Sequence, residues 1–332
     1  MKRSNPYIDL PLTPVRVLVM VLSALVYVSQ LVYGSVRGFI WFTLSKKTEA
    51  KRRKFHEIMW RFFRFDIRCH PWLYAHINNL YGETFRKGSI IICNHQSLLD
   101  TLCLLILSPR ILIVTHDKVW NNPLVAVVLR YADFFSVSDT EWEGRLDYFR
   151  SFVEKGYSIV VFPEGKRSAD GNIQRFHKGA FFLAEQIGAD ILPVFIHGAA
   201  HVLPLGKAFA NKGGFYIEIG KRIEPGDTTF GSDYTERCKR LNHYYREHFE
   251  EIRYRIETVD YYHHLVVELY AAIGLRKEAQ SVLRGEKADQ WNVNSLMTAL
   301  VQPEISVVVP APSALQKLYK KYTHLPENIM FV

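Results

Sequence analysis

The sequence predicts an α/β sandwich with a mostly parallel, mixed sheet, preceded by a membrane-embedded helix or helix pair. Two observations lead to this prediction. Between residue 89 and about residue 257, short β-branched apolar runs alternate with segments of helical periodicity, which is typical of βαβ units. Ahead of them, residues 15–44 are almost wholly apolar. The chain of 332 residues is long enough for one large domain or two smaller ones.

The formal net charge of +9 favours an anionic partner, such as a membrane surface, a phosphorylated substrate or a nucleic acid. Nucleic acid fits least well, because the basic residues gather beside an apolar segment without interleaved stacking aromatics. The cysteines lack the spacing of a zinc site or a disulfide framework, which favours a reducing compartment. They are Cys69, Cys93, Cys103 and Cys238. We therefore expect no metal and no bound cofactor.

Residues 1–45 are predicted to be a membrane anchor. Residues 17–33 approach the length of a bilayer span, and residues 34–44 carry the apolar stretch beyond it. Two arrangements fit: one tilted transmembrane helix, or two shorter helices that enter the membrane and return near Gly34 and Ser35. A cleaved signal peptide fits less well, because no small-residue cleavage site follows the apolar core.

A basic helix is predicted directly after the anchor. Between residues 46 and 68, nine Lys and Arg residues stand against three acidic residues. Phe55, Ile58, Met59 and Phe62 recur at the spacing of one helix face. This pattern is typical of a helix on an anionic membrane surface. It also suits a helix that packs its apolar stripe on the core and leaves its basic face in water. By the positive-inside tendency, the basic cluster places the following domain in the cytoplasm.

Residues 46–257 are predicted to form the α/β domain, with its core motifs within residues 89–200. The expected strands are 90–93, 111–115, 134–137, 158–162, 191–196 and 215–219. The expected helices are 97–107, 122–131, 141–155, 177–187 and 233–257. Residues 258–332 are predicted to be an appendage of unknown role. Its expected elements are a helix over 261–275, a strand over 305–309, a short helix within 310–322 and a last strand over 329–332.

The stretch 89–101 carries the first chemical signal. Asn94 and His95 follow a buried strand, at the position where an open α/β sheet presents its chemistry. On one continuous helix His95 and Asp100 would point about 140° apart, so they meet only if His95 lies in the turn before the helix. A carboxylate on one ring nitrogen leaves the other free to accept a proton. The alternative is that Asp100 caps the helix together with Ser97, and His95 is an ordinary turn residue.

A second polar turn follows the strand that begins at residue 158. Pro163 and Gly165 end the strand and leave charged side chains at the tip of the turn. Glu164 is expected to orient a basic cluster or to hold a substrate hydroxyl. The cluster, an expected anion pocket, comprises Lys166, Arg167, Arg175 and Lys178. The alternative is an ordinary solvated turn.

Together, Asn-His-x-x-x-x-Asp after one strand and Phe-Pro-Glu-Gly-x-Arg-Ser about seventy residues later closely resemble the glycerolipid acyltransferase family, which includes the lysophosphatidate acyltransferases. The resemblance covers about residues 50–220, and Ile191-Leu192-Pro193-Val194 is similar to a further block of the family. It implies an acyltransferase-type sandwich with His95 as general base and Asp100 as its orienting partner. Residues expected to contact substrate are Asn94, Glu164, Gly165, Lys166, Arg167, Ser168, Arg175 and Lys178.

The resemblance implies acyl transfer from an acyl carrier protein or coenzyme A thioester to the hydroxyl of a lysolipid or a glycerol phosphate at a membrane. One departure bears on the acceptor: Ser138 stands where the family usually has an arginine for the acceptor's phosphate. An aminolipid or another hydroxylated lipid is therefore an alternative acceptor, and Lys166 is a candidate replacement for the missing charge. A non-catalytic lipid-binding relative is the other alternative. Cys93 ends an apolar run and is expected to point into the core rather than act as a nucleophile.

Overall fold

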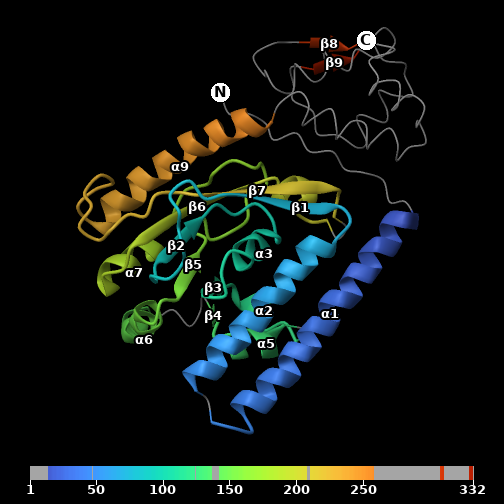
Figure 1. The fold of residues 1–332 in the computed structure, drawn as a ribbon. Helices are drawn as coiled ribbons and strands as arrows, with labels where there is room; N and C mark the ends of the chain where they lie inside the picture. Colours follow the sequence, from blue (N-terminus) through green and yellow to red (C-terminus); the bar gives the residue numbers. More distant parts are fainter. Residues whose placement is uncertain are drawn as a thin grey trace.

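A seven-stranded sheet lies at the centre of the computed structural model, with helices on both of its faces (Figure 1). The structure describes residues 14–46, 48–123, 125–136, 142–207, 210–257, 307–309 and 329–331. The strands are β1 Leu73–Asn78, β2 Ile90–Cys93, β3 Ile111–Thr115, β4 Phe135–Ser136, β5 Ser158–Val161, β6 Ile191–His197 and β7 Gly213–Ile219. The helices are α1 Pro14–Phe42, α2 Glu49–Cys69, α3 Asp100–Leu105, α4 Asp117–Trp120, α5 Ala126–Tyr131, α6 Trp142–Glu154, α7 Gly179–Ile187, α8 Ala199–Val202 and α9 Tyr234–Ile256.

The strand order is β1-β7-β6-β2-β5-β3-β4, and each neighbouring pair is parallel except β6 and β7. The predicted mostly parallel, mixed sheet is thereby confirmed. Strands β2, β5 and β6 are almost completely buried, as their continuous β-branched runs predict. Because β2 lies between β5 and β6, the turns that follow these three strands come together at one edge of the sheet.

Strand β1 is an element that the sequence analysis missed. It pairs in parallel with β7 at the edge of the sheet, with Leu73 beside Gly213 and Asn78 beside Glu218. Its residues are exposed or half-buried, so the strand lacks the apolar run that identified the central strands. Helix α3 also differs from expectation, since it begins at Asp100 rather than at Ser97. By contrast, α9 begins where predicted, and Asp233 caps it by accepting from the backbone N–H groups of Thr235 and Glu236.

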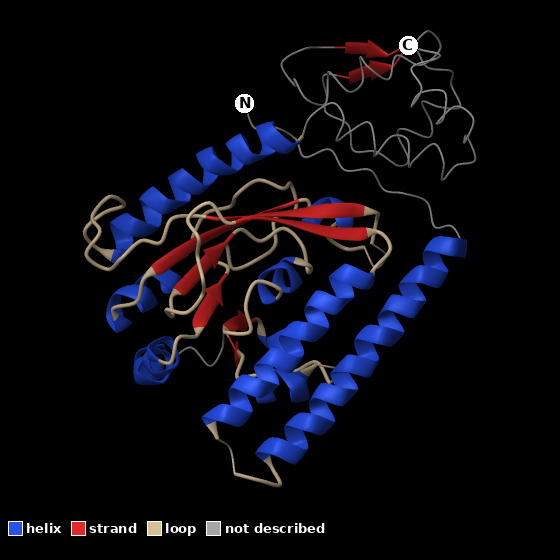
Figure 2. Ribbon diagram, in the orientation of Figure 1, coloured by secondary structure: helices blue, strands red, loops and turns tan. Residues whose placement is uncertain are grey.

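The apolar N-terminal segment forms one continuous helix, α1, which is long and apolar enough to cross a membrane. The helix runs through Gly34 and Ser35 without a break, so of the two arrangements considered the structure has the single helix and not the pair that returns at these residues. Helices α1 and α2 run side by side, with α1 on the outside (Figures 1 and 2). Edge-to-face contacts between Tyr33 and Phe62 and between Phe42 and Phe55 join them.

The apolar stripe of α2 packs on the core. Phe55 and Met59 are buried, and Ile58 and Phe62 are half-buried. This corrects the interpretation in which the stripe itself lies on the membrane, and it matches the alternative of a core-packing helix with a basic outer face. The exposed basic residues of that face include Arg53, Lys54, Arg61, Arg64 and Arg68.

In the C-terminal segment, β8 (Val307–Val309) and β9 (Ile329–Phe331) form a small parallel pair. Both strands lie within the ranges predicted from the sequence. The helices predicted over 261–275 and within 310–322 lie outside the described residues.

Candidate active site

His95 and Asp100 meet at the carboxyl end of β2. His95 lies in the turn after the strand, Asp100 is the first residue of α3, and His95 Nδ1 is 2.9 Å from Asp100 Oδ2. The Asp100 side chain is fully buried, whereas His95 retains 18% of its side-chain exposure. With Nδ1 held by the carboxylate, Nε2 is the nitrogen available to exchange a proton with a substrate.

The same carboxylate oxygen also holds the turn. Asp100 Oδ2 accepts hydrogen bonds from the backbone N–H groups of Gln96 at 2.6 Å and Ser97 at 2.8 Å. Both interpretations of Asp100, as a capping residue and as the partner of His95, therefore describe one set of contacts. Only one half of the capping pair expected for Ser97 and Asp100 is found among the described contacts. Asp100 accepts from Ser97 N, but Ser97 Oγ accepts from Leu99 N instead of Asp100 N.

Glu164 joins the two polar turns. Its Oε1 accepts from the backbone N–H of His95 at 2.7 Å, and its Oε2 accepts from the backbone N–H of Gln174 at 2.8 Å. Ser168 N donates to His95 O, and the Gln96 side chain donates to Gly171 O. Burial raises the pKa of Glu164 to about 7, although the hydrogen bonds from Gln174 and His95 act in the opposite direction. The loop that carries His95 is thus fixed to the loop that follows β5.

Three of the residues predicted to contact substrate have partners within the protein. The Asn94 side chain makes two hydrogen bonds to the backbone of Ile196. Its Nδ2 donates to Ile196 O, and its Oδ1 accepts from Ile196 N, each at 2.8 Å. Glu164 is buried with each carboxylate oxygen bonded to a backbone N–H, and buried Ser168 donates its hydroxyl to Asp170. All three side chains therefore help to position the site, and their contact with substrate stays a prediction.

Three comparisons with known proteins bear on these two loops. The protein-family model described as Acyltransferase matches residues 76–197, which include both. Residues 76–197 belong to the acyltransferase family. The chain is 27% identical over 177 residues to the chloroplastic 1-acyl-sn-glycerol-3-phosphate acyltransferase LPAT1 of Arabidopsis thaliana, a match that covers 52% of this chain and 49% of the relative. It is 26% identical over 148 residues to the human 1-acyl-sn-glycerol-3-phosphate acyltransferase beta, covering 43% and 53% of the two chains.

The chain spans about half the length of the curated relatives it matches. Among solved structures, the 1-acyl-sn-glycerophosphate acyltransferase PlsC of Thermotoga maritima matches with a TM-score of 0.59 and 23% identity, over 72% of this chain and 95% of that one. This likeness supports the acyltransferase-type α/β fold.

The four cations of the predicted anion pocket lie in two places. Lys166 and Arg167 project from the turn immediately after Glu164, where Gly165 adopts a φ of +68°. Arg175 and Lys178 are also exposed, and their charges act on Cys238 of α9. The first pair thus stands on the turn fixed to His95, and the second pair lies toward α9. Ser138, the departure from the family pattern, lies outside the described residues.

Two contributors to the candidate site escaped the sequence analysis. Phe162 stacks on the His95 ring with a centroid distance of 4.0 Å and an interplanar angle of 19°, which fixes the plane of the imidazole. Gln174 supplies the second N–H that holds Glu164. Phe162 stands within the second motif, so its position was a usable signal, whereas nothing local marks Gln174. Cys93 is buried behind the site, and burial raises the pKa of its thiol well above the ordinary value, as expected of a core residue.

Proposed function

We propose that this chain transfers a fatty acyl group from a thioester donor, acyl carrier protein or coenzyme A, to the hydroxyl of a lysolipid, with a 1-acylglycerol 3-phosphate-like lipid as the leading acceptor. The observation that carries the proposal is the 2.9 Å contact between His95 Nδ1 and buried Asp100 in a family-matched acyltransferase domain. The curated relatives are named for 1-acyl-sn-glycerol-3-phosphate acyltransferases, which favours this acceptor.

In the proposed mechanism, His95 Nε2 removes the proton of the lipid hydroxyl as the hydroxyl oxygen attacks the thioester carbonyl. Asp100 keeps Nδ1 protonated and stabilises the imidazolium that forms. Collapse of the tetrahedral intermediate forms the ester and expels the thiolate, which receives the proton. Lys166 and Arg167 are placed on the turn next to His95 and are suited to bind an anionic headgroup of the acceptor.

We also propose that α1 attaches the domain to a membrane by lying along its surface. Arg16, near the start of α1, donates to Ala210 O at 3.1 Å and to Asn211 Oδ1 at 2.6 Å. Near its other end, Gly38 packs on the ring of Tyr131 in α5. A helix of 29 residues spans about 43 Å, so these contacts hold it against the domain over most of its length. Its outer face carries exposed Val, Leu, Ile and Phe side chains suited to lipid, with the domain in the cytoplasm.

The decisive experiment replaces the proposed base in the full-length protein. Purified His95→Ala protein is incubated with radiolabelled acyl thioester and a panel of acceptors that includes lysophosphatidate, other lysolipids and an aminolipid. We expect the rate to fall by about 10²–10⁴-fold. His243→Ala is the matched control, because the His243 side chain is 74% exposed on α9. Normal turnover by His95→Ala would contradict the base assignment, and the acceptor used by the wild type decides between lysophosphatidate and the alternatives.

Absence of any acylated product from the wild type with every donor and acceptor would favour the non-catalytic lipid-binding alternative. Binding of labelled lysolipid to wild type and to His95→Ala with equal affinity, without turnover, is the result expected of such a protein. The two readouts therefore separate an enzyme from a binding protein.

A further inference from the structure

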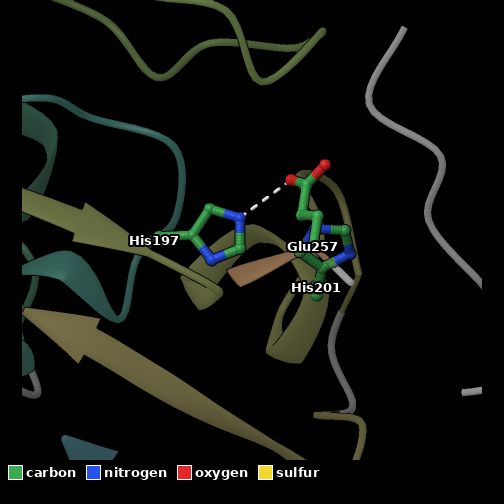
Figure 3. Close-up of side chains that lie close together, drawn as sticks. All are labelled: His197, His201 and Glu257. Atoms are coloured by element: carbon green, nitrogen blue, oxygen red, sulfur yellow. Dashed lines mark hydrogen bonds and ion pairs between the residues drawn. The ribbon is translucent and has the colours of Figure 1, made fainter. Parts of the chain in front are cut away.

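Two histidines and a glutamate converge beyond the carboxyl end of β6. His197 is the last residue of β6, His201 lies in α8, and Glu257 follows the last residue of α9. Figure 3 shows the three side chains pointing toward one another, with His197 and Glu257 joined by a hydrogen bond of 2.8 Å. All three are buried, and one potential ligand atom from each lies within 4.8 Å of the others.

The backbone between the two histidines creates this convergence. Gly198 has a φ of +91°, and a Cβ atom there would lie 2.2 Å from Gly214 O, so this position requires glycine. The turn at Gly198 joins β6 to α8, and His201 lies beside His197 with ring centroids 5.8 Å apart. The resulting His-x-x-x-His spacing, with a carboxylate from a distant segment, is common among zinc ligands.

The chemistry of the donor atoms suits cation binding. His197 and His201 each offer an imidazole nitrogen, the commonest metal ligand among side chains. Glu257 offers a carboxylate oxygen. The cluster therefore supplies two nitrogen ligands and one oxygen ligand.

We propose that His197, His201 and Glu257 form a binding site for a divalent transition-metal cation, with zinc as the preferred occupant. Imidazole nitrogens favour zinc over calcium or magnesium, which prefer oxygen ligands. Ligands on a tetrahedral zinc lie about 3.3 Å apart at the usual bond lengths. Ligand atoms that are now up to 4.8 Å apart must approach by up to about 1.5 Å, whereas His197 Nε2 and Glu257 Oε1, now 2.8 Å apart, must separate by about 0.5 Å. The hydrogen bond between His197 and Glu257 opens on binding, and the proton on His197 Nε2 moves to Nδ1 or to solvent.

The neighbouring charges permit this cation. Arg253 donates to both oxygens of Glu257, from Nε to Oε1 at 3.0 Å and from Nη2 to Oε2 at 3.4 Å, and also pairs with Glu250 at 3.0 Å. The formal charges of Arg253 and these two glutamates sum to −1, so a divalent cation would bring this sum to +1. Arg253 then acts from outside the ligand set to orient the Glu257 carboxylate. The occupied site would join β6, α8 and α9.

This inference is independent of acyl transfer, and its test measures metal. The full-length protein is purified with a tag that contains no histidine, stripped with a chelator and titrated with zinc, and bound metal is counted after dialysis. We expect about one zinc per chain and, with cobalt substituted for zinc, visible absorption bands typical of tetrahedral coordination. Magnesium and calcium should not compete.

His201→Ala and Glu257→Gln are each expected to weaken zinc binding at least about tenfold, whereas His243→Ala on the exposed face of α9 should bind as the wild type does. Thermal unfolding of the stripped proteins shows whether each variant is folded. If one of the two variants does not fold, the other still tests the site. The proposal is overturned if the wild type retains no zinc at a tenfold excess. It is also overturned if a folded His201→Ala or Glu257→Gln protein binds zinc as tightly as His243→Ala.

Discussion

At the scale of single residues, Asp100 performs two tasks with one oxygen. Its Oδ2 accepts from Gln96 N and Ser97 N and also contacts His95 Nδ1. Because the charge stabilises an imidazolium and the oxygen stabilises a buried turn, the proposed chemistry and the local fold depend on the same atom.

Asp100→Asn should therefore reduce both activity and stability. We expect acyl transfer to fall at least 10²-fold, because a neutral amide stabilises an imidazolium less well, and the free energy of unfolding to fall by about 1–3 kcal/mol. Turnover assays and denaturant unfolding on the same preparation check this. A loss of stability with normal turnover would assign Asp100 to capping alone.

Glu164 should make stability depend on pH. Its pKa is about 7 in the folded protein against an ordinary 4.5, so the folded state binds more protons between these values. Its contribution to stability is therefore present at low pH and is lost as the pH rises through about 7, with a slope of up to about 1.4 kcal/mol per pH unit. Buried His56 and His201, with pKa values lowered to about 4, act in the opposite direction.

The test is therefore the difference in the free energy of unfolding between wild type and Glu164→Gln, measured by thermal unfolding from pH 5 to pH 8. Removing the carboxyl group should cost most stability at pH 5 and progressively less toward pH 8. A difference that stays constant across this range would show that Glu164 does not titrate there.

At the scale of elements, close packing of α1 depends on glycine. A Cβ at residue 34 would lie 3.1 Å from the side chains of Met59 and Val128, and a Cβ at residue 38 would lie 2.4 Å from the Tyr131 ring. Spaced four residues apart, these glycines form the small-residue face that lets α1 approach α2 and α5.

Gly38→Val should accordingly separate α1 from α5. We expect a loss of roughly 1–3 kcal/mol from overpacking, seen as a lower melting temperature of the full-length protein. Ala24→Val, at an exposed position of the same helix, controls for helix propensity and added apolar surface. Equal melting temperatures for the two variants would mean that α1 does not pack on Tyr131 in solution.

At the scale of the whole molecule, the proposed membrane face combines the apolar outer side of α1 with the basic outer side of α2. Arg61 and Arg68 are exposed and stand seven residues apart, so they share one face of α2. Electrostatic attraction to anionic lipid adds about 1 kcal/mol for each basic residue near the surface and weakens with salt.

The double variant Arg61→Glu, Arg68→Glu should bind anionic vesicles more weakly than the wild type in a flotation assay, with little change on zwitterionic vesicles. The matched double variant Lys239→Glu, Arg246→Glu, at exposed positions seven residues apart on α9, should bind as the wild type does. An equal loss of binding to anionic vesicles in both double variants would indicate attraction by net charge alone, without a defined membrane face.

The sequence by itself determined the central strands, most of the helices and the two polar turns. The β-branched runs of β2, β5 and β6, the Asp233 cap and the apolar length of α1 are local patterns, and local patterns specify strands, helices and turns. The spacing of His95 and Asp100 already restricted them to a turn and the first turn of a helix, which is where they lie.

Only the tertiary structure decided which side chains meet across the chain. Glu164 bonds to the backbone of His95, and Asn94 bonds to the backbone of Ile196, because the sheet places β2 between β5 and β6. The gathering of His197, His201 and Glu257 likewise depends on where α9 ends. Such contacts join residues about 50 to 100 positions apart, and their geometry follows from strand order and packing, which no local pattern in the sequence encodes.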